Sequence, residues 1–178
     1  MKKTKKLALC AILSALGAVI LFIGSVIDVL DLSSAMFASM LILFVVVEIG
    51  GAWTWLTYSV TALTGILLLP NKLPAVIYIL VGYYPIVKEK LERLPRLISW
   101  IAKLFGFNLS LIAVFGILKL FFSSVSIELF PGMNAIYTYI IYFSVGNLIF
   151  VLYDVLLTRL VSFYILKLRK RLRIDRKK

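Results

Sequence analysis

The sequence predicts an all-α integral membrane protein, a bundle of six transmembrane helices with both termini in the cytoplasm. Three observations support this fold class. Hydrophobic residues make up 62% of the 178 residues and charged residues only 16%, against roughly 45–50% and about 25% in soluble domains. The mean hydropathy is +1.05. Lys and Arg outnumber Asp and Glu by 20 to 8, and these cations gather between apolar runs, as is typical near membrane surfaces.

Each predicted span is an apolar run bounded by glycine, proline or charged residues. A span needs about 20 apolar residues, so a chain of 178 residues can hold about six spans in a single membrane domain with short connections. The runs lie at residues 7–27, 34–49, 53–69, 73–87, 104–122 and 135–158.

The first run follows the basic start MKKTKK, a beginning that would also suit a signal peptide. The apolar stretch of a signal peptide has about 7–15 residues, and residues 7–27 exceed that length. We therefore expect an uncleaved first span. Gly50 and Gly51 then predict a tight turn between the second and third runs.

The fourth run, residues 73–87, is the shortest. At 1.5 Å per residue it covers about 22 Å of a hydrocarbon core roughly 30 Å thick, so both a short span and a re-entrant hairpin are conceivable. A hairpin would leave the basic stretch KEKLERLPR outside the cell. We expect a short span followed by an amphipathic cytoplasmic linker, residues 88–103, which lies on the membrane surface and is interrupted by Pro95.

The distribution of charge predicts the orientation. Seventeen of the 20 Lys and Arg lie at residues 2–6, 88–103 and 167–178, all on the side assigned to the cytoplasm. The last group belongs to a basic cytoplasmic tail, residues 159–178, which we expect to be attracted to anionic lipid headgroups. Because this bias accounts for the net charge of +12, we expect no nucleic-acid partner.

Catalytic chemistry is not expected. The chain has no His and a single Cys, Cys10, which excludes a disulfide framework and a Cys/His zinc site. We find no Ser/Lys or Ser/His arrangement and no paired acids within a span. Glu48, Asp154 and Arg159 fall near predicted inner helix ends, where hydration makes their charges inexpensive. The sequence therefore predicts no enzyme, no catalytic residue, no metal and no cofactor.

Polar and aromatic residues gather on the predicted outer face. Apolar walls with a few hydrogen-bonding groups at one end are typical of a small-molecule pocket. The same residues could instead be polar because outer loops meet water, and tyrosine favours the membrane interface. The candidate substrate-binding residues are Asp28, Asp31, Asn71, Lys72, Tyr78, Glu128, Asn134 and Tyr137.

Small side chains form a stripe on the first predicted helix. Ala8, Ala11, Ala15 and Ala18 recur at steps of three and four residues, which places them on one side of a helix. Small residues let a second helix approach closely where lipid supplies no hydrophobic drive. The periodicity fits packing within this protein's own bundle and docking on a partner equally well.

The chain resembles the substrate-binding S component of energy-coupling factor (ECF) transporters, which take up vitamins in bacteria. The size, the six spans, the basic start and the Ala-rich first helix with AILSA at residues 11–15 carry this resemblance. It implies a multi-pass protein of the bacterial cell membrane that captures a vitamin-like molecule from outside, with the first outer loop as a lid.

The resemblance also implies partners. Ala11 and Ala15, extended by Ala8, would contact the transmembrane T component, and paired cytoplasmic ATPases would drive transport. This chain has no P-loop of the form GxxxxGK[ST], so the partners would supply ATP hydrolysis. The family has an AxxxA motif on the first helix, and Ala11 and Ala15 match it.

Two other classes remain open. A non-transporting scaffold, similar to small multispan proteins of cell-shape or envelope complexes of the MreD type, would also have short loops and a small-residue helix face. In that case the outer polar groups would coat a surface rather than converge on a cavity. A self-contained channel or carrier would need broken helices or an internal repeat, and the sequence indicates neither.

Overall fold

The computed structural model describes residues 3–121 and 135–168. Most of these residues lie in helices, and no strand occurs among them. The chain divides into two compact units, Met1–Val125 and Ser126–Lys178. The predicted all-α class is therefore confirmed for the part of the chain that the structure describes.

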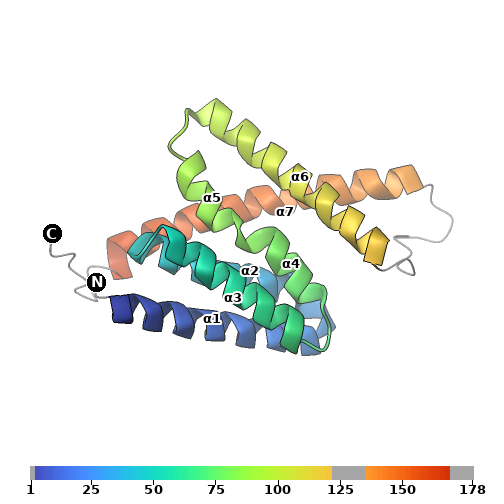
Figure 1. Ribbon diagram of the computed structural model, residues 1–178. Coiled ribbons are helices and arrows are strands. Elements are labelled where there is room, and N and C mark those ends of the chain that lie inside the picture. The colour runs from blue at the N-terminus through green and yellow to red at the C-terminus, as the bar shows by residue number, and fades with distance from the viewer. Residues whose placement is uncertain (1–2, 122–134, 169–178) are drawn as a thin grey trace. The chain divides into compact units, whose positions relative to one another are not determined.

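The first unit contains six α-helices and one short 3-10 helix within its described residues (Figure 1). Within its described residues, the second unit has one long helix followed by a turn of π-helix. In chain order the elements are α1 (Lys3–Val26), η1 (Asp28–Leu30), α2 (Asp31–Glu48), α3 (Ala52–Leu68), α4 (Leu73–Gly82), α5 (Tyr84–Leu91), α6 (Arg96–Phe121), α7 (Ala135–Phe163) and η2 (Tyr164–Leu168).

Four helices among the described residues are long and apolar enough to cross a membrane. They are α1, α2, the segment Arg96–Ala113 of α6, and the segment Ile140–Lys167 that includes most of α7. Helix α3 is apolar but has 17 residues, and α4 has only 10. Four of the six predicted spans thus reach this length, and the count of six stays a prediction.

The segment after residue 73 differs from the sequence prediction. Residues 73–87 are not one continuous helix: α4 ends at Gly82, and α5 runs from Tyr84 to Leu91. Pro85 lies in the first turn of α5. Proline has no N–H and cannot continue the hydrogen-bond ladder of the preceding helix, which accounts for the break.

The linker predicted at residues 88–103 is likewise not a separate element. Its first residues complete α5, and its second half forms the first turns of α6, which begins at Arg96 rather than at residue 104. Pro95 stands just before that start, and its carbonyl accepts the N–H of Ser99 at 2.9 Å. Proline is well tolerated at a helix start, and the interruption expected at Pro95 is present between α5 and α6.

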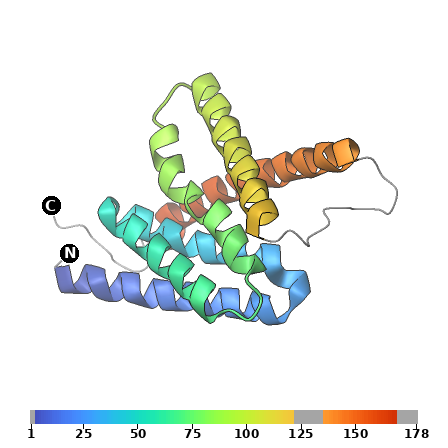
Figure 2. The same ribbon diagram turned by 45° about the vertical axis from the view of Figure 1, so that its right-hand side comes forward.

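Helices α1, α2, α3 and α4 enclose the core of the first unit (Figure 2). Small residues bring α1 close to its neighbours. A Cβ on Gly17 would stand 3.0 Å from Cγ2 of Thr61 in α3, and a Cβ on Gly24 would overlap the side chain of Ser34 in α2. The buried core residues are Leu21, Ala35, Ala38, Ile42, Val46, Ala62, Leu69, Ala75, Tyr78 and Ile86.

The turn predicted at Gly50 and Gly51 is present between α2 and α3. Both residues have φ of +66°, a conformation that is readily available only to glycine. The N–H of Gly50 donates to the carbonyl of Val45 at 2.9 Å. The turn reverses the chain, so that α3 returns beside α1 and α2 (Figures 1 and 2).

The close approach at Gly24 yields a stability prediction. We expect Gly24→Ala to destabilise the protein by about 1–3 kcal/mol, because the added methyl overlaps Ser34 in a packed contact. Gly106→Ala is the matched control: apart from its chain neighbours and the backbone of its own helix, no atom of the described residues lies within 4 Å of its Cβ position, and the gain in helix propensity is worth up to about 1 kcal/mol. Thermal unfolding in detergent measures the stability of both variants. Equal stability of Gly24→Ala and the unchanged protein would contradict the packing.

Candidate functional site

The α1–α2 and α3–α4 connections lie at the same end of the first unit (Figures 1 and 2). This end carries four of the candidate substrate-binding residues. Asp28 begins η1 and Asp31 begins α2. Asp31 is buried, and its backbone carbonyl accepts a hydrogen bond from Oγ of Ser34 at 3.0 Å. Asn71 and Lys72 occupy the α3–α4 connection.

Asn71 and Lys72 make hydrogen bonds within their own loop. Oδ1 of Asn71 accepts the N–H of Leu73 at 3.0 Å, at the start of α4. Nζ of Lys72 donates to the carbonyl of Leu69 at 2.5 Å, just beyond the end of α3. Helix ends leave backbone groups without intrahelical partners, so both side chains stabilise the connection itself.

Tyr78, the candidate on α4, belongs to the core of the first unit. It is fully buried, and its ring centroid lies 5.7 Å from that of Tyr58 in α3. Trp55 meets the edge of Tyr58 at 6.0 Å with an interplanar angle of 84°. The three rings form an aromatic cluster that joins α3 to α4, and Tyr78 is its innermost member.

The remaining candidates lie elsewhere. Glu128 and Asn134 are outside the described residues. Tyr137 lies in the first turn of α7, in the second unit, and is exposed. The structure thus brings Asp28, Asp31, Asn71 and Lys72 to one end of the first unit, whereas Tyr78 packs in its core.

Two tyrosines near the α4–α5 break make hydrogen bonds that sequence reasoning missed. The hydroxyl of Tyr58 donates to the carbonyl of Ile79 at 2.9 Å, within the last turn of α4, where carbonyls lack intrahelical donors. The hydroxyl of Tyr83 shares a hydrogen bond of 2.7 Å with Oγ of Ser110 in α6. The stretch GYYP at residues 82–85 was the signal, because Pro85 implies freed backbone carbonyls.

Helix α1 presents small residues on two different faces. The face buried in the fold carries Cys10, Ser14, Gly17, Leu21, Gly24 and Ser25. Ala8, Ala11 and Ala15 are exposed, and Ala18 is half-buried at the border between the faces. Oγ of Ser14 donates to the carbonyl of Thr57 at 3.4 Å, so the buried face packs on α3. The row Ala8–Ala11–Ala15, hereafter the alanine row, is not the face that α1 uses in this core.

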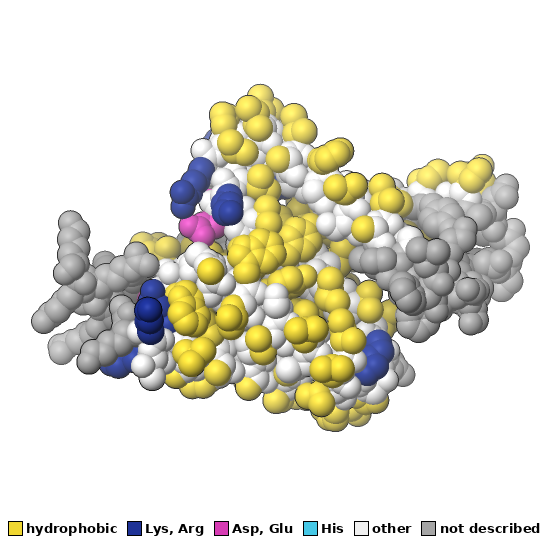
Figure 3. Space-filling model, in the orientation of Figure 1, with side chains coloured by type: hydrophobic (Ala, Val, Ile, Leu, Met, Phe, Trp, Pro, Cys, Tyr) yellow, Lys and Arg dark blue, Asp and Glu magenta, His cyan; other side chains and the backbone are white. Residues whose placement is uncertain are grey.

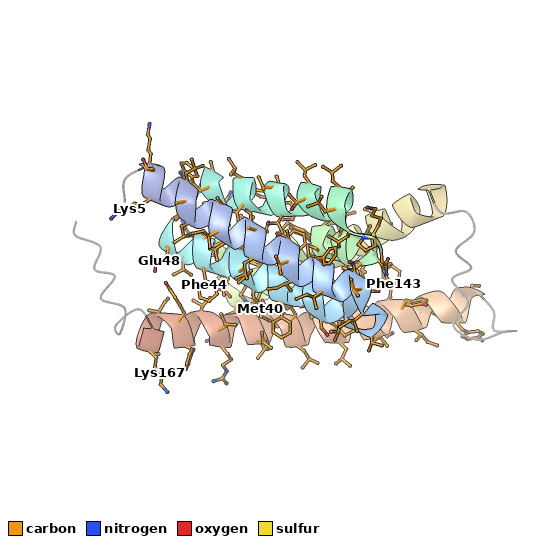
Figure 4. All side chains as sticks on the ribbon, turned by 90° about the horizontal axis from the view of Figure 1, so that it is seen from below. Lys5, Met40, Phe44, Glu48, Phe143 and Lys167 are labelled. Atoms are coloured by element: carbon orange, nitrogen blue, oxygen red, sulfur yellow. The ribbon has the colours of Figure 1, made fainter. Side chains whose placement is uncertain are left out.

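The surface between the helix ends is largely hydrophobic. On the face seen in Figure 3, apolar side chains cover the middle of the first unit, and Lys and Arg side chains gather towards the helix ends. Figure 4 locates Lys5 in α1 and Glu48 in α2 at the same end of this unit, with Met40, Phe44 and Glu48 in a row along α2. Exposed apolar sides with charged ends suit an environment that is apolar only at its centre.

No metal centre or match to a known protein identifies the site. Among the described residues, no group of three or more His, Cys, Asp or Glu side chains could hold a metal ion. Comparisons with protein-family models, with curated proteins and with solved structures gave no match. The function is therefore inferred from the chain's own residues.

The tyrosine at the end of α4 yields a second prediction. Tyr58→Phe should lower the free energy of unfolding by about 1–3 kcal/mol, because the carbonyl of Ile79 loses the hydroxyl that donates to it. Tyr137→Phe, at an exposed position in α7, should change stability by less than about 0.5 kcal/mol. Thermal unfolding of both variants in detergent measures this difference in stability. A Tyr58→Phe protein as stable as the Tyr137→Phe protein would show that this bond is dispensable.

Proposed function

We propose that this chain is a multi-pass protein of the bacterial cell membrane with six spans and both termini in the cytoplasm. The four long apolar helices support passage through a bilayer. Helix α3, with 17 residues, would extend about 25 Å, and the pair α4–α5 covers residues 73–91, about 28 Å if helical throughout. Both lengths approach a hydrocarbon core of roughly 30 Å.

Within that membrane, we propose that the chain is the substrate-capture subunit of an ECF-type uptake transporter for a vitamin or similar micronutrient. The observation that carries this proposal is the exposed alanine row on α1. The core of the first unit uses the other face of the helix. An exposed row of small residues lets a partner helix approach closely within lipid, which is what docking on a T component requires.

The candidate substrate-binding end supports capture from outside. The connections that carry Asp28, Asp31, Asn71 and Lys72 share one end of the first unit, opposite the end with Lys5 (Figure 4). In the proposed orientation, this end faces the exterior. A carboxylate there could meet a cationic ligand and Lys72 an anionic one. ATP hydrolysis would come from the cytoplasmic partners, because the chain has no P-loop.

One observation favours the second candidate, a scaffold of an envelope or cell-shape complex. The contacts of Asn71 and Lys72 described above cap the ends of α3 and α4. Side chains that stabilise their own loop fit the scaffold, in which the outer polar groups cover a surface and form no binding cavity. Ligand binding distinguishes the two functions.

Docking through the alanine row is testable by co-expression. We expect Ala11→Leu combined with Ala15→Leu to abolish recovery of a host T component and its ATPases in a detergent pull-down, because the larger side chains keep the partner helix away. Both alanines are exposed, so the free energy of unfolding should change by less than about 0.5 kcal/mol.

The matched control enlarges exposed residues of α1 outside the row. Leu16→Phe combined with Ile23→Phe adds apolar volume to the same helix at exposed positions that lie about a quarter turn away from the row and should leave the complex intact. Failure of the Ala11→Leu, Ala15→Leu protein to fold would assign the row to the protein's own core. Normal recovery of the partners with that protein would exclude docking there.

Ligand capture is testable by a thermal-shift screen with vitamins. A ligand at 100 times its dissociation constant should stabilise the protein by about 2.7 kcal/mol. The triple variant Lys72→Ala, Asn134→Ala and Tyr137→Ala should lose that shift, whereas Lys5→Ala, at the opposite end of the first unit, should keep it. An unchanged shift in the triple variant would reject these site residues. No shift with any vitamin would favour the scaffold.

A further inference from the structure

The junction of α5 and α6, residues 88–103, is a compact charged corner. Lys88 from α5 and Lys103 from α6 are 3% and 6% exposed, and Nζ of each pairs with Oε1 of Glu92, at 3.2 and 3.6 Å. Nζ of Lys103 also lies 5.4 Å from the ring centroid of Trp100. One carboxylate therefore ties the two helices together at their junction.

The corner carries more positive than negative charge. Its sequence has five cations and two carboxylates, a net charge of +3. Both carboxylates already contact cations of the corner, since Glu92 pairs with the two lysines and Glu89 pairs with Arg93 at 3.0 Å. Lys90, Arg93 and Arg96 are all exposed. Figure 3 shows Lys and Arg side chains gathered here beside an acidic group.

The first turn of α6 adds to this positive potential. It contains no acidic residue and begins with Arg96. The N-terminus of a helix carries a partial positive charge and favours anions, so a cation there is unfavourable by itself. An external anion at the corner would offset both the helix dipole and the arginine.

The apolar side chains beside these cations indicate where the anion comes from. Leu97 is 79% exposed and Ile101 is 67% exposed, one turn further along α6, and Leu94 and Ile98 are exposed as well. Cations next to exposed aliphatic residues are typical of elements at the membrane interface, where the aliphatic groups enter the acyl region and the cations meet lipid phosphates. A soluble anion would give these aliphatic residues nothing to contact.

We propose that the α5–α6 corner binds the phosphate headgroup of an anionic phospholipid at the cytoplasmic surface, through Lys90, Arg93 and Arg96. This inference rests on the membrane passage proposed above and is independent of the ligand and of the partner. Each cation near an anionic lipid surface contributes roughly a fivefold factor in affinity. Loss of all three should therefore weaken the preference for anionic lipid by about a hundredfold.

Trp100 provides a reporter inside the corner. The chain has three tryptophans, so Trp53→Phe with Trp55→Phe leaves Trp100 alone. This protein is reconstituted in phosphatidylcholine vesicles that contain a small fraction of acyl-brominated phosphatidylglycerol or of acyl-brominated phosphatidylcholine. We expect phosphatidylglycerol to quench Trp100 fluorescence at a much lower mole fraction than phosphatidylcholine, and high salt to reduce the difference.

Three variants in that background test the cations. Lys90→Gln, Arg93→Gln and Arg96→Gln together should remove the preference for phosphatidylglycerol, and Arg93→Lys with Arg96→Lys should retain it, because charge is preserved. The matched control, Lys3→Gln, Lys5→Gln and Lys6→Gln, removes the same charge from the start of α1 and should retain the preference. Circular dichroism confirms that each protein is helical.

The outcomes separate this proposal from the proposed function. Equal quenching by the two lipids in the parent protein would reject the headgroup site and leave membrane passage standing. No quenching by either lipid would place Trp100 outside the bilayer and reject the headgroup site. Failure of the parent protein to incorporate into the vesicles would overturn membrane passage. Millimolar glycerol phosphate should leave most of the preference in place, because it lacks the acyl chains that would contact Leu97 and Ile101. Complete removal of the preference would show that the phosphate group alone carries the binding and would reject the contact of lipid with these aliphatic residues.

Discussion

The fold of the first unit depends on the close approach of α1 to α2 and α3. Gly17 and Gly24 leave room for Thr61 and Ser34, and Gly65 of α3 similarly faces Ala75 of α4. Small residues let helices approach closely, and their tight fit supplies dispersion contacts between the helices. This fit sets the positions of the helices in the first unit, and it thereby places the α1–α2 and α3–α4 connections at the same end.

Hydroxyl groups complement that packing. Thr57 and Thr61 of α3 donate to carbonyls one turn earlier in their own helix, at 2.9 and 3.0 Å, so they enter the core with their hydroxyls satisfied. Only the hydroxyl of Ser14 crosses from α1 to α3, at 3.4 Å, among the hydrogen bonds described here. The α1–α3 contact therefore tolerates polar residues without relying on a strong polar bond, and shape accounts for most of its specificity.

Hydropathy and turn chemistry predicted much of the helical layout. The predicted runs 34–49 and 53–69 match α2 and α3 to within three residues, and the glycine pair between them has the conformation that a tight turn needs. The prediction failed at Pro85, which divides the run 73–87, whereas the break expected at Pro95 is present between α5 and α6. A proline can end one helix or start the next. Pro85 separates α4 from α5, whereas Pro95 precedes a continuous α6.

The candidate site was less accessible to sequence reasoning. Periodicity placed the alanines on one side of α1 but could not say which side faces the core, since Ser14, Gly17 and Gly24 form a second small-residue face. Hydropathy also could not reveal that Tyr78 packs in the core against Tyr58. Such assignments depend on contacts between residues that are distant in sequence. The periodicity and hydropathy of a short stretch carry no information about those contacts.

The buried face of α1 also has a chemical consequence. Cys10 is the chain's only thiol, and it is 1% exposed against the neighbouring helices. A buried thiol is out of reach of reagents in solution, so maleimide reagents should label the native protein poorly. A cysteine introduced at any exposed position would then be the preferred target of labelling, without prior removal of Cys10. The unaltered chain is therefore a suitable background for measuring which of its loops a reagent can reach.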